Sequence, residues 1–179
     1  GVTFTGGEPL MQYDFLLAVL KECRKNWIHT AIETSGFIST EKFLKVFSLL
    51  DFAFVDVKNM DDEAHKWGTG VSNRQTLQNI SALANSDWRG RLVLRIPTIH
   101  GFNDSDENAH KVIDFMNENG LYEINLLKFH RLGQTKWEQL GLEYEYAHKG
   151  DMTDERMSEL QDLYLDANIA CYVGDNTPF

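Results

Sequence analysis

Five short segments of the chain are apolar at almost every position, and each is followed by glycine or polar turn residues. These segments are expected to be β-strands. They are Val2–Thr5, Thr30–Thr34, Phe52–Val57, Leu92–Pro97 and Glu123–Leu127. Elsewhere, apolar residues recur every three to four positions, which is the spacing of an amphipathic helix. The predicted helices are Tyr13–Asn26, Thr40–Leu50, Asn73–Ala84, Ser105–Asn119 and Thr153–Ala167.

The alternation of strand and helix predicts an α/β fold with a parallel sheet, because a parallel neighbour is reached through a crossover helix. Nearly continuous apolar strands indicate burial on both faces of that sheet. A doubly wound sheet and a βα barrel both satisfy this pattern, and periodicity alone does not separate them. With 42% hydrophobic residues and no low-complexity tract, residues 1–179 are expected to form one domain. Because a strand opens the chain, we interpret it as a fragment of a larger protein.

Charge and cysteine content narrow the classes of partner. A formal net charge of −10 and an isoelectric point near 5.0 oppose attraction to nucleic acid or to an anionic membrane. No apolar run approaches the roughly 18 residues of a membrane span, and no leader is visible, so a cytoplasmic location is expected. Cys23 and Cys171 lie far apart without metal-ligand spacing, and both are expected to be structural thiols.

Polar residues follow every predicted strand, at the end where ligands gather in parallel α/β folds. After the first strand, Gly6 and Gly7 permit a sharp turn that leaves room for a ligand, and Glu8 supplies an acceptor. An ordinary strand-to-helix turn explains this motif as well. The other polar strand ends are Glu33-Thr34-Ser35-Gly36, Asp56-Val57-Lys58, Arg95 with Pro97–Gly101, and Lys128-Phe129-His130.

Asp56 and Lys58 are expected on one face of their strand, because side chains alternate between the two faces. The pair could grip a zwitterion or a ribose diol, or could form an internal salt bridge. Glu33, with Thr34 and Ser35, offers acceptors for an ammonium group or an alkali cation, although a plain turn is the simpler explanation of this segment.

A histidine and an isoleucine complete the candidate set. His130 could donate to a ligand oxygen or ring nitrogen, but a lone histidine is more often structural. Ile99 with Gly101 could form an apolar wall against an aromatic base, or could simply pack a turn. Each of these signals is weak alone.

Together the candidates outline a pocket for a small amphoteric molecule. Glu8 and Glu33 suit an amino group, and Lys58 suits a carboxylate. Asp56 or His130 suits hydroxyl groups, and the apolar wall suits an adenine face. S-adenosylmethionine (SAM) carries all of these groups.

In this order the motifs resemble those of the radical SAM superfamily, and within it the activating enzymes of glycyl radical enzymes, which include pyruvate formate-lyase activating enzyme. The matching motifs are Gly1–Pro9, Ile32–Phe37, Val55–Lys58, Gly70–Asn73 with Thr76-Leu77, Arg95–Asp104, and Leu126–Gly133 with Lys136-Trp137. The resemblance implies a partial (β/α)6 TIM-like barrel whose first βα unit is missing, with five strands visible. It also implies that the glycine-glycine-glutamate motif holds the methionyl amino group and that Lys58 meets the methionyl carboxylate. The expected cofactor-binding residues are therefore Gly6, Gly7, Glu8, Glu33, Asp56, Lys58, Arg95, Ile99 and His130.

The resemblance implies radical chemistry as well. A reduced 4Fe-4S cluster would cleave SAM to methionine and a 5′-deoxyadenosyl radical, which would remove hydrogen from a glycine of a partner such as pyruvate formate-lyase. Flavodoxin or ferredoxin would supply the electron. The family's Cys-x-x-x-Cys-x-x-Cys motif, whose thiolates hold the cluster, is absent from these 179 residues. We therefore expect no metal ligand and no catalytic residue here, and an inactive chain in isolation.

Two substitutions depart from the family pattern. Glu33 stands where pyruvate formate-lyase activating enzyme has an aspartate, and Lys128 replaces a proline. Arg95 and the Phe102-Asn103-Asp104 loop are candidates for partner docking or closure. Two other interpretations stay open: an aldolase-like enzyme with Lys58 as a Schiff-base lysine, and a module that binds SAM or another small ligand without catalysis.

Overall fold

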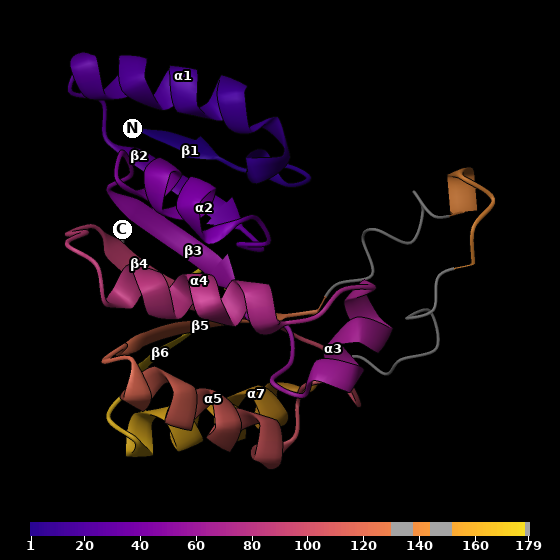
Figure 1. The fold of residues 1–179 in the computed structure, drawn as a ribbon. Helices are drawn as coiled ribbons and strands as arrows, with labels where there is room; N and C mark the ends of the chain where they lie inside the picture. The colour runs from indigo at the N-terminus through magenta and orange to yellow at the C-terminus, as the bar shows by residue number, and fades with distance from the viewer. Residues whose placement is uncertain (130–137, 144–151, 178–179) are drawn as a thin grey trace.

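The protein folds as one open sheet of parallel strands with helices packed against it. Figure 1 shows the computed structural model, which describes residues 1–129, 138–143 and 152–177. The strands lie side by side in chain order, and every neighbouring pair is parallel. They are β1 (Val2–Phe4), β2 (Thr30–Thr34), β3 (Phe52–Asp56), β4 (Arg91–Thr98), β5 (Glu123–Lys128) and β6 (Ala170–Val173).

Helices make the crossovers between successive strands. They are η1 (Pro9–Gln12), a 3₁₀-helix, and the α-helices α1 (Tyr13–Lys25), α2 (Thr40–Phe47), α3 (Asp62–Thr69), α4 (Arg74–Ala84), α5 (Asp106–Glu118) and α7 (Asp154–Asp166). Within the described ranges, no helix is both long and apolar enough to cross a membrane.

The strand order decides between the two architectures that the sequence left open. A doubly wound sheet reverses direction at a switch point, whereas these strands follow one another from β1 to β6 without reversal. That order is the order of a βα barrel, here opened into a partial one. The predicted α/β fold and partial barrel are therefore confirmed.

The five predicted strands and five predicted helices are present, with ends that differ by up to three residues. The expectation of five strands was wrong, because β6 pairs with β5 as a sixth. The four apolar residues of β6 do not alternate with polar ones, so only their pairing with β5 identifies them as a strand. Helix α3 was also missed; Asp61 caps its first turn through Ala64 N at 2.8 Å, and Gly70 ends it with φ 79°.

The main hydrophobic core lies between the sheet and its helices. Strand residues such as Ile32, Val55 and Leu94 point to this side and pack with Phe43 and Phe47 of α2. Figure 1 shows that helices α1, α2, α4, α5 and α7 lie along this face of the sheet. The apolar strands predicted burial on both faces of the sheet, but the other face has no layer of helices among the residues described.

This second face, called the open face below, has a small apolar centre. Ala31, Phe52, Phe54 and Val93 form it, and each is buried by its neighbours. Side chains alternate along each strand, so the same face carries polar residues toward both strand ends. The position of the polar residues on this face decides where a ligand can bind.

Candidate functional site

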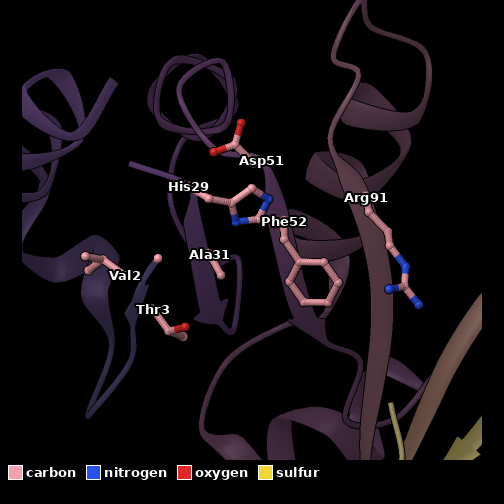
Figure 2. Close-up of a pocket in the computed structure, with 8 residues that line it drawn as sticks. Val2, Thr3, His29, Ala31, Asp51, Phe52 and Arg91 are labelled. Atoms are coloured by element: carbon pink, nitrogen blue, oxygen red, sulfur yellow. The ribbon is translucent and has the colours of Figure 1, made fainter. Parts of the chain in front are cut away.

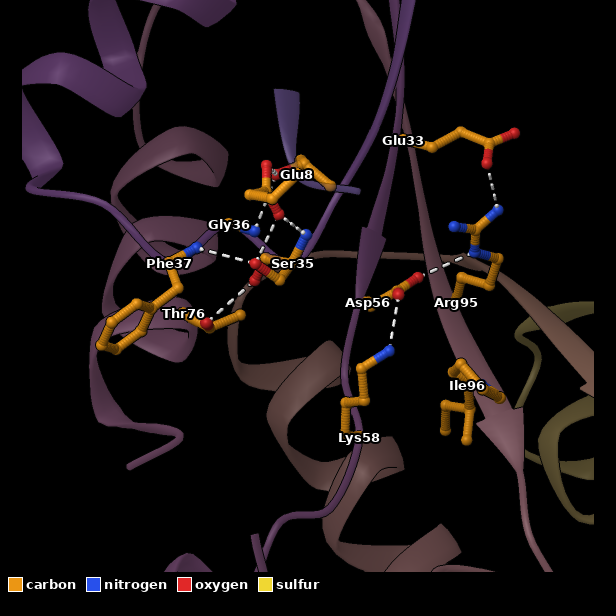
Figure 3. A network of polar contacts seen from close by, with 12 residues as sticks. Glu8, Glu33, Ser35, Gly36, Phe37, Asp56, Lys58, Thr76, Arg95 and Ile96 are labelled. Atoms are coloured by element: carbon orange, nitrogen blue, oxygen red, sulfur yellow. Dashed lines mark hydrogen bonds and ion pairs between the residues drawn. The ribbon is translucent and has the colours of Figure 1, made fainter. Parts of the chain in front are cut away.

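A polar network lies at the carboxyl ends of β2, β3 and β4, on the open face (Figure 3). Asp56 and Arg95 are direct partners in the ladder between β3 and β4. Arg95 Nε donates to Asp56 Oδ1 at 2.7 Å, and Lys58 Nζ donates to Asp56 Oδ2 at 2.7 Å. Val57 points into the core between them. The prediction that Asp56 and Lys58 share a face is confirmed, and in this structure they pair with each other.

Glu33 joins this network from β2. Its Oε2 lies 3.1 Å from Arg95 Nη1, and Thr5 Oγ1 donates to the same oxygen at 3.1 Å. Arg95 reaches it across the ring of Phe54, whose centroid lies 5.2 Å from the guanidinium carbon. Burial lowers the pKa of Arg95, but the carboxylates of Asp56 and Glu33 outweigh burial and hold that pKa above its ordinary value. Arg95 therefore stays charged.

Glu8 forms a second, adjacent network. Its carboxylate accepts from Leu10 N at 3.0 Å, Thr34 Oγ1 at 2.6 Å, Ser35 N at 2.8 Å and Ser35 Oγ at 2.6 Å. A carboxylate has about four acceptor positions, so these bonds occupy them. Glu8 caps η1 and fixes the β2–α2 loop to the end of β1.

The hydroxyl groups of this loop agree with the simpler of the two explanations, a structural turn. The sequence offered Thr34 and Ser35 as possible ligand acceptors beside Glu33, with a plain turn as the simpler explanation. In the structure both hydroxyls donate to Glu8, and they accept from Gly36 N at 3.0 Å and Phe37 N at 3.4 Å. Their hydrogen bonds therefore serve the loop.

The two glycines after β1 leave the space that the sequence predicted. Gly6 has φ 122°, a backbone conformation that residues with a Cβ rarely adopt. A Cβ built on Gly6 or Gly7 would meet no atom within 4 Å. Both glycines are exposed, so a ligand can approach the backbone of this turn.

Ile99, the candidate adenine wall, follows β4 and is 8% exposed. Asn103 accepts a hydrogen bond from Ile99 N and donates to Lys58 O. One side chain thus connects two candidate ligand contacts. His130, the last member of the predicted set, lies outside the described residues.

The two adjacent networks together form what is called the carboxyl-end site below, and the charges of this site do not cancel. Three carboxylates, those of Glu8, Glu33 and Asp56, face two cations, Lys58 and Arg95, which leaves a formal charge of −1. The Glu33 and Lys58 side chains are each 32% exposed, whereas those of Asp56 and Arg95 are 13% and 14% exposed. The arrangement can accept a small ligand with a net positive charge and a carboxylate.

A cavity of about 490 Å³ lies at the opposite ends of the strands (Figure 2). It is lined by Gly1, Val2, Thr3, His29, Ala31, Asp51, Phe52 and Arg91. Two of its three titratable side chains are already engaged: Asp51 accepts from Thr30, and Arg91 is paired with Glu123. Parallel βα folds bind ligands at the carboxyl ends, so the size of this cavity does not make it the candidate site.

Both cysteines are buried on the helix-covered side, as expected of structural thiols. Cys23 lies in α1 and Cys171 in β6, and neither forms a disulfide. Burial raises the pKa of the Cys171 thiol to about 12, which opposes the thiolate that a metal ligand requires. No group of three potential metal ligands was found among the residues described. These residues therefore do not fit an iron–sulfur cluster.

Comparison with protein families decides which fold family these features belong to. The profile described as the radical SAM superfamily matches residues 1–113. The chain belongs to the radical SAM superfamily. The matched segment includes β1 to β4 and therefore every candidate site residue except His130.

Curated relatives of this radical SAM chain are activating enzymes. A 4-hydroxyphenylacetate decarboxylase activating enzyme of Clostridium scatologenes is 68% identical over 179 residues, which is all of this chain and 57% of the relative. An indoleacetate decarboxylase activating enzyme of Tractidigestivibacter scatoligenes is 35% identical over 173 residues, which is 97% of this chain and 55% of the relative. The chain thus spans a little over half the length of these relatives.

Solved structures share the fold. A domain of pyruvate-formate lyase-activating enzyme from Bacteroides vulgatus superposes with a TM-score of 0.80 at 26% identity, covering 97% of this chain and 98% of that one. Streptococcus suis SuiB bound to SAM has a TM-score of 0.73 at 14% identity, covering 96% of this chain and 39% of SuiB. The second likeness shows the fold alone.

Proposed function

We propose that this half-barrel binds SAM as part of an activating enzyme, which uses SAM to remove a hydrogen atom from a glycine of a partner enzyme. The observation that carries the proposal is the carboxyl-end site with its formal charge of −1. SAM has a sulfonium, an ammonium and a carboxylate, and hence a net charge of +1. Opposite net charge, together with the partly exposed Lys58 ammonium for the carboxylate, favours SAM over a phosphorylated ligand.

Each part of SAM has a proposed contact. Lys58 Nζ has three donors and spends one on Asp56, so it can also bind the methionyl carboxylate. Glu33, partly exposed, would accept from the methionyl ammonium. Asp56 and His130 would accept or donate at the ribose hydroxyls, and Ile99 would pack against the adenine. Arg95 would hold Asp56 and Glu33 in place.

Glu8 has a supporting role in this proposal. Its oxygens already accept four hydrogen bonds, so an ammonium would have to displace one of the hydroxyl donors. The carbonyls of the exposed Gly6 and Gly7 are the better acceptors. Glu8 would keep that turn in position by anchoring it to β2.

The redox part of the reaction belongs to groups outside this chain's described residues. A 4Fe-4S cluster held by cysteines elsewhere in the whole protein would supply the electron that cleaves SAM to methionine and a 5′-deoxyadenosyl radical. A flavodoxin or ferredoxin would reduce the cluster. The residues described here bind SAM, orient its reacting bond and exclude water, since the radical chemistry itself is the cofactor's.

The partner is proposed to be a glycyl radical enzyme. The names of the relatives favour a decarboxylase of an arylacetate over the pyruvate formate-lyase that the motifs first suggested. The Schiff-base alternative is weaker, because that chemistry needs an unprotonated lysine amine. Lys58 Nζ instead lies 2.7 Å from a carboxylate oxygen.

The test uses the whole protein, reconstituted anaerobically with iron and sulfide. We expect the EPR signal of the reduced 4Fe-4S cluster to change when SAM is added, and 5′-deoxyadenosine to form. We also expect a glycyl radical signal on an added 4-hydroxyphenylacetate decarboxylase but none on pyruvate formate-lyase. SAM binding without cleavage would instead support the binding module. A cluster signal indifferent to SAM would overturn the proposal.

A further inference from the structure

The loops after β3 and β4 are joined by a set of buried asparagine side chains. Asn59 Nδ2 donates to Phe102 O at 2.7 Å, and Asn108 Oδ1 accepts from Met60 N at 2.9 Å. Asn103 lies between them and is 4% exposed. These bonds link the segment that carries Lys58 to the segment that carries Ile99.

Asn103 makes the central contacts. Its Nδ2 donates to Lys58 O at 2.6 Å and to Pro97 O at 2.9 Å, and its Oδ1 accepts from Ile99 N at 2.8 Å. Carbonyl groups only accept and a backbone amide only donates, so these partners fix which way the amide group faces. Both donors and the acceptor of this side chain are used.

The place of Asn103 in the sheet explains why a side chain is needed there. The ladder between β3 and β4 ends at Asp56 and Arg95, with one further bond from Val57 N to Arg95 O at 2.8 Å. Lys58 and Ile99 both lie beyond that point. Beyond the end of the ladder, the side-chain amide of Asn103 bonds to the backbone groups of Lys58 and Ile99. It does so because buried backbone groups must find partners.

We propose that Asn103 is a positioning residue that sets the spacing between Lys58 and Ile99 for SAM. This inference rests on the proposed function, in which Lys58 binds the methionyl carboxylate and Ile99 packs against the adenine. A ligand that spans both contacts depends on their spacing. A fragment that touches only one of them does not.

The experiment compares SAM with its two halves on the whole, cluster-loaded protein. Asn103→Leu keeps the branched shape and removes all three hydrogen bonds without adding charge. We expect SAM to bind about tenfold more weakly, the loss that corresponds to one hydrogen bond of ordinary strength. Methionine and 5′-deoxyadenosine, measured separately, should each lose less than about threefold. Hydrogen exchange at Ile99 N should become faster.

A matched control separates positioning from general destabilisation. Asn73 is also 4% exposed, and its Nδ2 donates to two backbone carbonyls, Asn59 O at 3.1 Å and Met60 O at 2.9 Å. It does not connect Lys58 with Ile99. Asn73→Leu should therefore lower stability while the affinities for SAM and the fragments change in parallel. If Asn103→Leu does not fold, Asn103→Ala serves, since it also removes the three bonds.

The outcomes distinguish this inference from the function on which it rests. If the unaltered protein binds SAM but the Asn103 variants weaken SAM and fragments equally, or weaken neither, Asn103 is not a positioning residue and the proposed function stands. If the unaltered protein does not bind SAM, both proposals are overturned. A loss confined to SAM, absent from the Asn73 variant, supports the positioning role.

Discussion

The two ends of the open face use the same chemistry for different purposes. At each end an arginine lies over a phenylalanine ring and binds a carboxylate. The amino-end cluster consists of Arg91, Glu123 and Tyr172, and the carboxyl-end cluster consists of Glu33, Asp56, Lys58 and Arg95. The arginine carbons lie 5.4 Å and 5.2 Å from the two ring centroids.

Charge balance and exposure separate the clusters. In the amino-end cluster one arginine and one carboxylate cancel, and Tyr172 donates to Glu123 at 3.1 Å. Glu123 is 8% exposed, so its carboxylate is closed to a ligand, whereas the Arg91 side chain is 31% exposed. In the carboxyl-end cluster the two carboxylates and two cations also cancel, but the adjacent Glu8 adds a third carboxylate, and the Glu33 and Lys58 side chains are each 32% exposed. The buried Glu123 carboxylate therefore stabilises the sheet, whereas the extra carboxylate of Glu8 beside the carboxyl-end cluster favours a ligand with a net positive charge.

Removing the lysine of the carboxyl-end cluster should have the largest effect. For Lys58→Met in the whole protein, we expect SAM to bind roughly ten- to hundredfold more weakly, because a charged hydrogen bond contributes about 1.5–3 kcal/mol. Equilibrium dialysis measures this. Lys111→Met is the control, since Lys111 pairs with Glu107 on α5, away from the site. Equal affinities in both variants would contradict the assignment of Lys58.

Removing the carboxylate of the amino-end cluster should lower stability and leave SAM binding unchanged. Glu123→Gln removes the partner of Arg91, and breaking a buried ion pair typically costs about 3–5 kcal/mol. The Arg91 side chain is 31% exposed, so water can solvate it, and we expect about 1–2 kcal/mol in the free energy of unfolding.

Urea denaturation measures the effect of Glu123→Gln. As a control, Glu159→Gln breaks an exposed pair with Arg156 and should change stability by less than about 0.5 kcal/mol. If Glu123→Gln weakens SAM binding and leaves the free energy of unfolding unchanged, the two clusters do not differ in purpose.

A third polar group, on α3, should give the smallest effect and show a dependence on pH. A hydrogen bond from Ser72, helped by Lys66, lowers the pKa of Asp62 from 3.8 to about 2. Because the pKa of Asp62 is lower in the folded chain than in the unfolded chain, the contribution of Asp62 to folding stability is present above about pH 4. It is lost as the pH falls toward 2.

Urea midpoints between pH 5 and pH 2.5 test this sign. The advantage of the unaltered chain over Asp62→Asn should shrink as the pH falls. A stability advantage that is constant, or that grows as the pH falls, would show that Ser72 and Lys66 do not favour the ionised form of Asp62 in the folded chain.

Local patterns predicted much of the fold, because strand and helix periods depend on which residues must face the core. The segment Phe52-Ala53-Phe54-Val55 reads as a strand from its own residues, and alternation placed Asp56 and Lys58 on one face. The same reasoning missed β6, whose four residues have no period of their own. It also missed α3, which depends on capping by Asp61 and Gly70.

The candidate site was predicted as a set of residues but not as a network. Sequence reasoning placed Glu8 and Glu33 together at an amino group. In the structure Glu8 is occupied by four donors, while Glu33 reaches across β3 to Arg95. The sequence offered the loop of Asn103 only for partner docking or closure. It gave no signal of a positioning role, since asparagine is common in loops and its three partners lie close only when the loops meet.

The sequence by itself determined the strand–helix alternation, the polar strand ends and the family, because each depends on residues close together in the chain or on motifs in a fixed order. Tertiary structure alone decided which carboxylates already accept hydrogen bonds from the protein and which charges remain uncancelled. It also decided how Asn103 links Lys58 to Ile99. These properties depend on distances of a few ångströms between side chains far apart in sequence, and only the packing of the sheet sets such distances.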